Sequence, residues 1–284
     1  MNLIFGAAAG LALLLAVPAA HADDWSHHYT VNGRPAVRLA VSDGDVQIQR
    51  GSGNAVDVDI KSAHYNISND VSISENQNGN SIDIGIRPRA NHWFNWGINM
   101  GTGLKVTIAV PFDADLDINT GDGNIVALAV SGRIQFSTSD GNITSDGLKG
   151  TLKFHSGDGH IDARNLDGSL AADTGDGNMA VQGRFDLLDL RTGDGNVVAE
   201  AAANSQPGNA GWKLKSGDGS IVLRIPSSFR ANLEARTGDG RISVNFPLTV
   251  SGTLNESSLN AQINGGGPTV EINTGDGSIR VERQ

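Results

Sequence analysis

Apolar and polar residues alternate in short runs along most of the chain. Leu152, Phe154 and Ser156 take every second position before one turn, and Ile161 and Ala163 do so after it. A period of two is typical of a β-strand with one buried face. We therefore expect an all-β protein in which Leu152, Phe154 and Ser156 point inward.

Most turns between these runs share a motif of Thr or Ser, Gly, Asp and Gly, as in Thr174-Gly175-Asp176-Gly177-Asn178, and the turns at Asp43 and Asp140 have Ser directly before the Asp. From Asp122 to Asp194 the motif aspartates are 18 residues apart, and the later gaps are 24, 21 and 37 residues. The last gap is close to two periods, which predicts a degenerate coil between Val250 and Gly267. The turn aspartates are Asp122, Asp140, Asp158, Asp176, Asp194, Asp218, Asp239 and Asp276, with a ninth copy at Asp43.

One 18-residue unit holds too few apolar residues to close a core, so the constant spacing favours coils stacked into a solenoid. Neighbouring coils would then lie about 4.8 Å apart. A second corner is predicted at Gly132, Gly150 and Gly168, ten residues after a motif aspartate. The alternative is a meander of hairpins with glycine-rich turns. Residues 199–203, rich in alanine, form the only short helical candidate.

The motif has a structural interpretation and a functional one. Glycine adopts a positive φ without steric cost, and Asp accepts backbone N–H groups in its own turn, which makes the aspartates structural turn residues. Alternatively, the stacked carboxylates bind Ca²⁺, as in a calcium-stabilised β-roll. Because each coil offers one motif carboxylate, we expect no metal site and no cofactor.

The net charge of −10 comes from 31 acidic and 21 basic residues, and the nine motif aspartates nearly equal this excess. Nucleic-acid binding depends on clustered Lys and Arg, so this balance argues against a nucleic-acid partner. The chain has no cysteine, which excludes disulfides and thiolate metal sites.

Residues 1–22 have the features of a cleaved signal peptide. An apolar run from Leu3 to Val17 precedes Pro18 and the small-x-small sequence Ala20-His21-Ala22. The run is shorter than the roughly 20 residues of a membrane-spanning helix, and no lipid-modified cysteine is available at the cleavage site. We expect a periplasmic or extracellular protein that does not span the membrane.

Residues 87–100 interrupt the strand pattern with three large aromatic residues, Trp93, Phe94 and Trp96. These side chains would suit a stacking platform for a sugar ring or for a partner's apolar patch. Alternatively, the loop caps the open end of the solenoid. The predicted organisation is a signal peptide (1–22), an N-terminal β region (23–115) and a repeat solenoid (116–284).

Catalytic chemistry has little support in the motifs. The pair His27-His28 lacks an identifiable third metal ligand, and the chain contains no phosphate-binding loop or nucleophile elbow. A carbohydrate-active enzyme built on a β-helix remains an alternative, because a solenoid brings distant carboxylates together.

The Thr-Gly-Asp-Gly-Asn-Ile turns between alternating strands, behind a signal peptide, resemble those of a bacterial β-strand-repeat family of adhesin-like proteins. The resemblance runs from about Val37 to the end and is strongest from Leu116 to Val281. It implies a right-handed parallel β-helix whose molecular function is unassigned. We therefore expect an exported, non-enzymatic structural or binding module of the cell envelope, with an unknown envelope, protein or carbohydrate partner.

Overall fold

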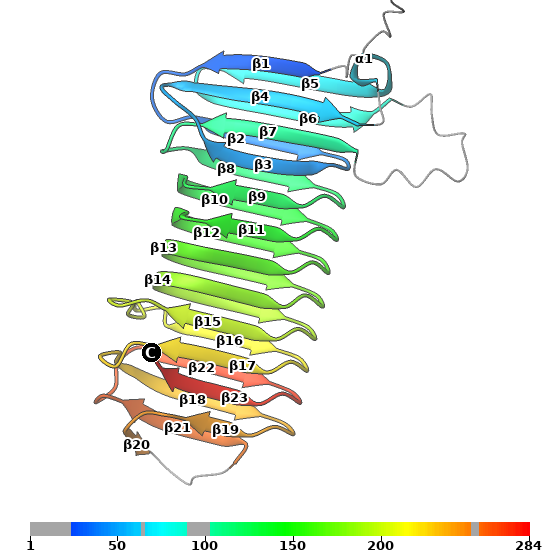
Figure 1. Cartoon of the computed structure of the whole chain (residues 1–284). Helices are drawn as coiled ribbons and strands as arrows, with labels where there is room; N and C mark the ends of the chain where they lie inside the picture. Colours follow the sequence, from blue (N-terminus) through cyan, green and yellow to red (C-terminus); the bar gives the residue numbers. More distant parts are fainter. Residues whose placement is uncertain (1–23, 64–65, 90–102, 251–255) are drawn as a thin grey trace, which may run out of the picture.

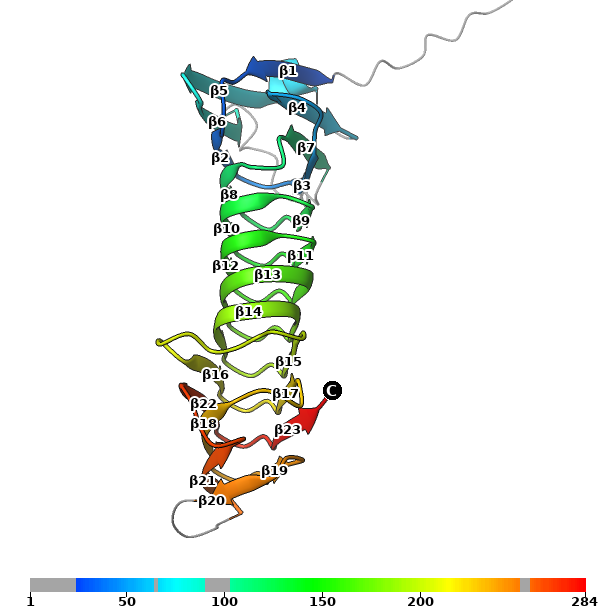
Figure 2. The same ribbon diagram turned by 90° about the vertical axis from the view of Figure 1, so that its left-hand side faces the viewer.

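The computed structural model describes residues 24–63, 66–89, 103–250 and 256–284 (Figure 1). These residues form an all-β, solenoid-like fold, a single sheet of 23 strands with one short helix, α1 (Ile67–Asp70). Figure 2 shows the coils stacked in one column between two differently built ends.

The strands fall into three groups along the stack. The N-terminal group is β1 (Trp25–Thr30), β2 (Ala36–Val41), β3 (Asp45–Arg50), β4 (Ala55–Ser62), β5 (Val71–Asn78), β6 (Ser81–Pro88) and β7 (Leu104–Val110). The central group is β8 (Asp115–Thr120), β9 (Ile125–Leu128), β10 (Ser131–Thr138), β11 (Ile143–Asp146), β12 (Lys149–Ser156), β13 (Ile161–Thr174), β14 (Met179–Thr192), β15 (Val197–Ala201), β16 (Trp212–Ser216) and β17 (Ile221–Ile225). The C-terminal group is β18 (Ala231–Thr237), β19 (Ile242–Val244), β20 (Leu248–Val250), β21 (Ser258–Ile263), β22 (Thr269–Thr274) and β23 (Ile279–Arg283).

The central strands pair in parallel with the equivalent strand of the next coil. In β10, β12 and β13, Phe136 pairs with Phe154, and Phe154 pairs with Ala172. Strands joined by a motif turn, such as β12 and β13 across the turn at Asp158, are therefore successive parts of a coil. The hairpin alternative is wrong for these turns, because a hairpin would pair its two strands with each other in antiparallel fashion.

The core lies between the two faces of the stack. In β12, Leu152, Phe154 and Ser156 are buried and the residues between them are exposed, so their predicted inward orientation is confirmed. The ring of Phe154 is fully buried and stacks on that of Phe136, with the ring centroids 5.3 Å apart. Residues 199–203 are not helical, since Ala199 and Ala201 lie on β15 and are buried in the core.

The first and last coils of the chain are not at the ends of the stack. Strand β2 lies between β6 and β8, and β3 lies between β7 and β9. At the other end, β22 lies between β16 and β18, and β23 lies between β17 and β19 (Figure 1). Both terminal segments are thus inserted between coils formed by internal segments.

This insertion corrects the prediction of a degenerate coil between Val250 and Gly267. In that region β20 and β21 pair antiparallel, and β21 also pairs antiparallel with β18 at the outer end of the stack. The gap of 37 residues arises because the chain builds this end cover before returning to form the inserted coil. Antiparallel strands also cover the opposite end, where β5 pairs with β6 and β4 pairs with β7.

Replacing Phe154 with Ala should lower the free energy of unfolding by about 3–5 kcal/mol, because it removes a fully buried ring from a stacked pair. Chemical denaturation measures this loss. Lys153→Ala on the exposed face of the same strand is the control and should change stability by no more than about 0.5 kcal/mol. A nearly neutral Phe154→Ala would contradict the assigned strand register.

Candidate functional site

The motif turns form one edge of the stack, and the eight turns from Asp122 to Asp276 are each fixed by a buried hydroxyl group, whereas the Asp43 turn has Val41 at the equivalent position. Ser156 Oγ donates a hydrogen bond to the Gly141 carbonyl of the preceding coil (2.8 Å) and accepts one from Gly159 N–H in its own turn (2.9 Å). Thr138 Oγ1 makes the same two contacts with Gly123 and Gly141. The hydroxyl groups that donate across the coils in this way are Thr120, Thr138, Ser156, Thr174, Thr192, Ser216, Thr237 and Thr274.

The motif glycines are required by close contact between backbones. A Cβ atom on Gly159 would lie 1.9 Å from the carbonyl oxygen of Gly141, and one on Gly157 would lie 2.3 Å from that of Ser139. Neither Gly157 nor Gly159 has a positive φ, so the conformational reason expected from the sequence is wrong here. Positive φ does occur at the second corner, where Gly150 has a φ of +110°.

The residue after each motif Asp-Gly pair adds a second ladder. The backbone N–H of Asn142 donates to Asn124 Oδ1 (3.0 Å), and that of His160 donates to Asn142 Oδ1 (2.8 Å). His160 Nδ1 then accepts from the N–H of Asn178 (2.9 Å). The ladder follows the spatial order of the coils, since Ser220 is bonded to Ser278 of the inserted coil.

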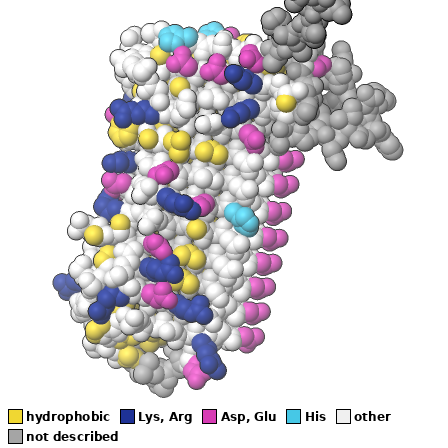
Figure 3. All heavy atoms as spheres, viewed as in Figure 1, with side chains coloured by type: hydrophobic (Ala, Val, Ile, Leu, Met, Phe, Trp, Pro, Cys, Tyr) yellow, Lys and Arg dark blue, Asp and Glu magenta, His cyan; other side chains and the backbone are white. Residues whose placement is uncertain are grey.

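The eight motif aspartates named above from Asp122 to Asp276 are all exposed. Acidic side chains form a regular column along this edge in Figure 3. Across the described residues these carboxylates make no hydrogen bond or ion pair, so the expected bond from Asp to its own turn is not seen. The corner is held by the hydroxyl group and by the close backbone contact, while adjacent carboxylates in the column repel each other.

Asp43, on the inserted N-terminal coil, differs from the other motif aspartates. Its Oδ1 atom is buried and has no hydrogen-bond partner. Burial, followed by the negative charges of Asp122 and Asp45, raises the pKa of this carboxyl group. A negative charge on Asp43 is therefore unfavourable in the folded chain.

Two further sets of candidate residues come from the sequence, the aromatic residues within 87–100 and the pair His27-His28. Trp93, Phe94 and Trp96 lie outside the described residues. His27 and His28 pair with different carboxylates, Glu75 (3.1 Å) and Asp57 (2.6 Å). The described segments contain no cluster of three or more His, Cys, Asp or Glu residues that could hold a metal ion.

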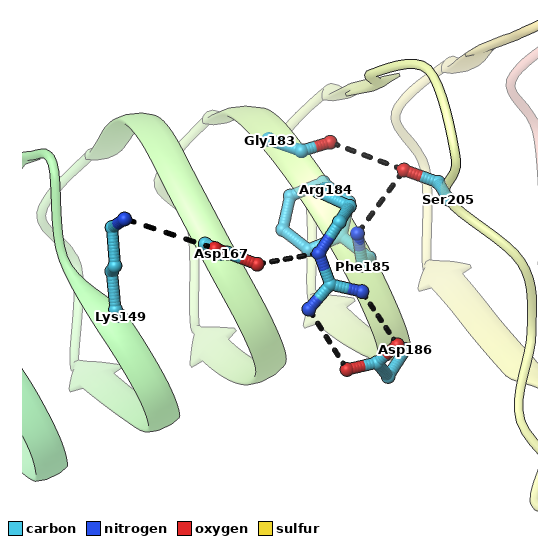
Figure 4. Close-up of polar contacts among 7 residues, drawn as sticks. All are labelled: Lys149, Asp167, Gly183, Arg184, Phe185, Asp186 and Ser205. Atoms are coloured by element: carbon cyan, nitrogen blue, oxygen red, sulfur yellow. Dashed lines mark hydrogen bonds and ion pairs between the residues drawn. The ribbon is translucent and has the colours of Figure 1, made fainter.

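The outer faces carry ion pairs that join neighbouring coils. Figure 4 shows Arg184 between Asp167 and Asp186, with 2.6 Å between Arg184 Nη1 and Asp186 Oδ1. The hydrogen bonds from Arg184 lower the pKa of the Asp186 carboxyl group. Beside them, Ser205 of the segment between β15 and β16 accepts the N–H of Phe185 (3.1 Å). That segment accounts for the longer gap of 24 residues between motif aspartates.

No helix within the described ranges has the length and hydropathy needed to cross a membrane.

The model of the Toastrack DUF4097 family matches residues 36–282. The comparison with curated proteins gives no match. The chain is similar to a "putative lipid binding protein" from Parabacteroides distasonis, with 16% identity, coverage of 92% of this chain and 97% of that one, and a TM-score of 0.46. It is also similar to a "putative adhesin" from Parabacteroides merdae, with 13% identity, the same coverages and a TM-score of 0.43. These likenesses are too distant to carry a functional argument.

Replacing Gly159 with Ala should lower the free energy of unfolding by about 3 kcal/mol, the upper part of the usual range for overpacking, because the added methyl group forces two coil backbones apart. Thermal and chemical denaturation measure the loss. Gly208→Ala is the control, because its Cβ would meet one atom, the Asp186 carbonyl oxygen, at 3.3 Å. Equal effects of the two substitutions would contradict the close-contact explanation.

Replacing Asp43 with Asn should stabilise the fold at neutral pH, because the folded-state pKa lies above the ordinary value of 3.8. Above the raised pKa the ionised group destabilises the folded chain. As the pH falls from that pKa towards 3.8, the folded chain takes up a proton before the unfolded chain does, and the penalty shrinks to zero. Denaturation of both proteins from neutral to acidic pH should therefore show a shrinking difference. A difference that is independent of pH would contradict this assignment.

Proposed function

The chain belongs to the Toastrack DUF4097 family, and we propose that it is an exported, non-enzymatic structural or binding module of the bacterial cell envelope. The export signal is the apolar segment within residues 1–22, and the mature protein would be periplasmic or extracellular. The proposal divides the mature chain into an N-terminal β region (23–115) and a repeat solenoid (116–284).

The proposed architecture is a right-handed parallel β-helix with coils of about 18 residues. Parallel pairing of residues 18 positions apart in β10, β12 and β13 supports the coil length, as between Phe136 and Phe154. The right-handedness of the proposed β-helix is what the resemblance of the turns to the β-strand-repeat family implies.

The observation that carries the proposal is the continuous bonding from coil to coil. Strand pairing, the buried hydroxyl groups and the ladder of residues that follow each motif Asp-Gly pair connect the coils from β2 to β19. Such a stack behaves as a stiff rod with two extended outer faces, as in other solenoid proteins that bind partners along their length. A rod of this kind suits a role as a structural spacer. It also suits the binding of an extended envelope, protein or carbohydrate partner.

Two alternative functions, a calcium-stabilised β-roll and a carbohydrate-active enzyme, make different demands on the structure. A calcium-stabilised β-roll needs several oxygen ligands around each ion, whereas each coil contributes one motif carboxylate. A carbohydrate-active enzyme needs an acid and a second carboxylate about 5–9 Å apart across a bound sugar. Here many acids recur in the turns or pair with basic side chains of adjacent coils, as Asp117 does with Arg38. The residues Trp93, Phe94 and Trp96 stay candidates for partner binding.

The proposal is tested by expressing the full chain in a bacterium and following its processing and location. The expected result is a mature protein beginning near Asp23 that is recovered from the periplasm or medium. When added back to washed cells, it should be retained by isolated envelopes. A chain that keeps Met1 and stays in the cytoplasm, or one that cleaves envelope polysaccharide, would overturn the proposal.

Thermal melting in a chelator and in excess Ca²⁺ should give nearly the same midpoint. A specific site saturated at about one hundred times its Kd would stabilise the fold by about 2.7 kcal/mol. Excess Mg²⁺ is the control for general screening of the aspartate column. Stabilisation by Ca²⁺ of this size, and not by Mg²⁺, would favour the calcium-stabilised β-roll.

A further inference from the structure

The outer face of β6, β2, β8 and β10 is hollowed on both sides of Arg38. One hollow of about 410 Å³ is lined by Ala36, Ser81, Asp115 and Arg133, among others. A second, of about 240 Å³, lies beside Ala40 and Gly85, and Arg38 and Asp83 line both. We propose that this Arg38 groove binds a neutral oligosaccharide, which specifies a ligand class for the binding role proposed above and rests on it.

The groove exists because the inserted strand β2 carries small residues on its outer face. Ala36 and Ala40 flank Arg38 at alternate positions, and their register partners on β6 are Ser81 and Gly85. Two adjacent strands thus lack bulky side chains in the same rows, so the sheet surface is open there. The insertion of β2 beside β6 is what brings these small residues together.

Arg38 is held in place by carboxylates on both neighbouring strands. Its Nη1 atom lies 3.7 Å from Asp83 on β6, and its Nε atom lies 3.3 Å from Asp117 on β8. Within the described residues Arg38 Nη2 makes no hydrogen bond to the protein, so this group of the five-donor guanidinium can donate to a ligand. Across the three strands β6, β2 and β8, the groups alternate as a hydrogen-bond acceptor (Asp83), a donor (Arg38) and an acceptor (Asp117). Neighbouring strands are about 4.8 Å apart.

The wall formed by β10 adds further polar groups. The side chains of Arg133 and Gln135 line the larger hollow and make no side-chain hydrogen bond or ion pair within the described residues. Ala36 contributes an apolar methyl group that can pack against the C–H face of a sugar ring.

A hydroxyl group both donates and accepts hydrogen bonds, so a polyhydroxylated ligand satisfies the carboxylates and the guanidinium group at once. The charges in the groove do not favour anions. Its two hollows are lined by four carboxylates, Glu75, Asp83, Asp115 and Asp117, against the guanidinium groups of Arg38 and Arg133, and Arg34 pairs with Asp115 from outside the lining. With no excess of positive charge the groove offers an anionic polymer no net attraction, whereas a neutral saccharide needs none.

Arg224 provides a matched control elsewhere on the stack. It also lies between two carboxylates of neighbouring coils, Glu200 and Glu282, and its Nε is 3.1 Å from Glu282. Arg224 does not line either hollow of the Arg38 groove. Arg38→Gln and Arg224→Gln therefore remove the same kind of cross-coil pair, but the first alone alters the groove.

The test is calorimetric titration of the mature chain with hexaoses of the cello, chito and malto series. At least one hexaose should bind, and Arg38→Gln and Asp83→Asn should each weaken binding at least about tenfold, the loss expected for a hydrogen bond to a charged group. Arg224→Gln should bind as the wild type does. Denaturation midpoints of all variants verify that they are folded.

Failure of the groove and failure of the proposed function give different results. If no hexaose binds while isolated envelopes still retain the protein, the groove inference is wrong and the proposed function stands. Equal binding by the wild type and Arg38→Gln, or equal weakening in Arg38→Gln and Arg224→Gln, would also overturn the inference. Binding of an extended peptide in place of every hexaose would assign the groove to another ligand class.

Discussion

The Gly-Asp-Gly turns bring the backbones of neighbouring coils into direct contact, and the rest of the stack depends on this closeness. At Gly159 the space that a Cβ would need is already occupied by the Gly141 carbonyl oxygen. The buried Ser156 hydroxyl group satisfies that same carbonyl, which would otherwise be a costly unpaired acceptor at the edge of the core. Sterics and hydrogen bonding therefore fix the same coil spacing at each turn.

The inserted terminal coils solve the problem that open ends pose for a solenoid. A terminal coil exposes unpaired strand edges, which favour aggregation. Here β2 and β22 are paired on both sides, and antiparallel strands cover the outermost coils. Arg38 lies on the inserted strand β2 and pairs with Asp83 on β6, and Arg224 pairs with Glu282 on the inserted strand β23. These ion pairs help to specify which strands become neighbours.

Much of this arrangement was predictable from local sequence. The period of two placed Leu152 and Phe154 in the core, because burial on one face leaves a clear signal at single positions. The insertion of the termini was not predictable, because β22 has the same sequence pattern whether it extends the stack or enters it. For the same reason, the gap of 37 residues, which is close to two periods, predicted an extra coil where the chain forms the end cover. The reason for the motif glycines was also missed, since close contact between coils is a property of the stack and leaves no mark on a single turn. The outer-face groove depends on the insertion and could not be located without it.

Within one turn, the central claim is that Thr174 and the glycines build the coil contact while Asp176 does not. Thr174→Val keeps the side-chain shape but removes the hydroxyl group that donates to the Gly159 carbonyl (2.9 Å). Asp176→Asn keeps the shape and removes a charge that its neighbours repel. Chemical denaturation at low salt should show that Thr174→Val loses about 1–3 kcal/mol and that Asp176→Asn is neutral or more stable than the wild type. A marked loss of stability in Asp176→Asn, with Thr174→Val unchanged, would contradict the account.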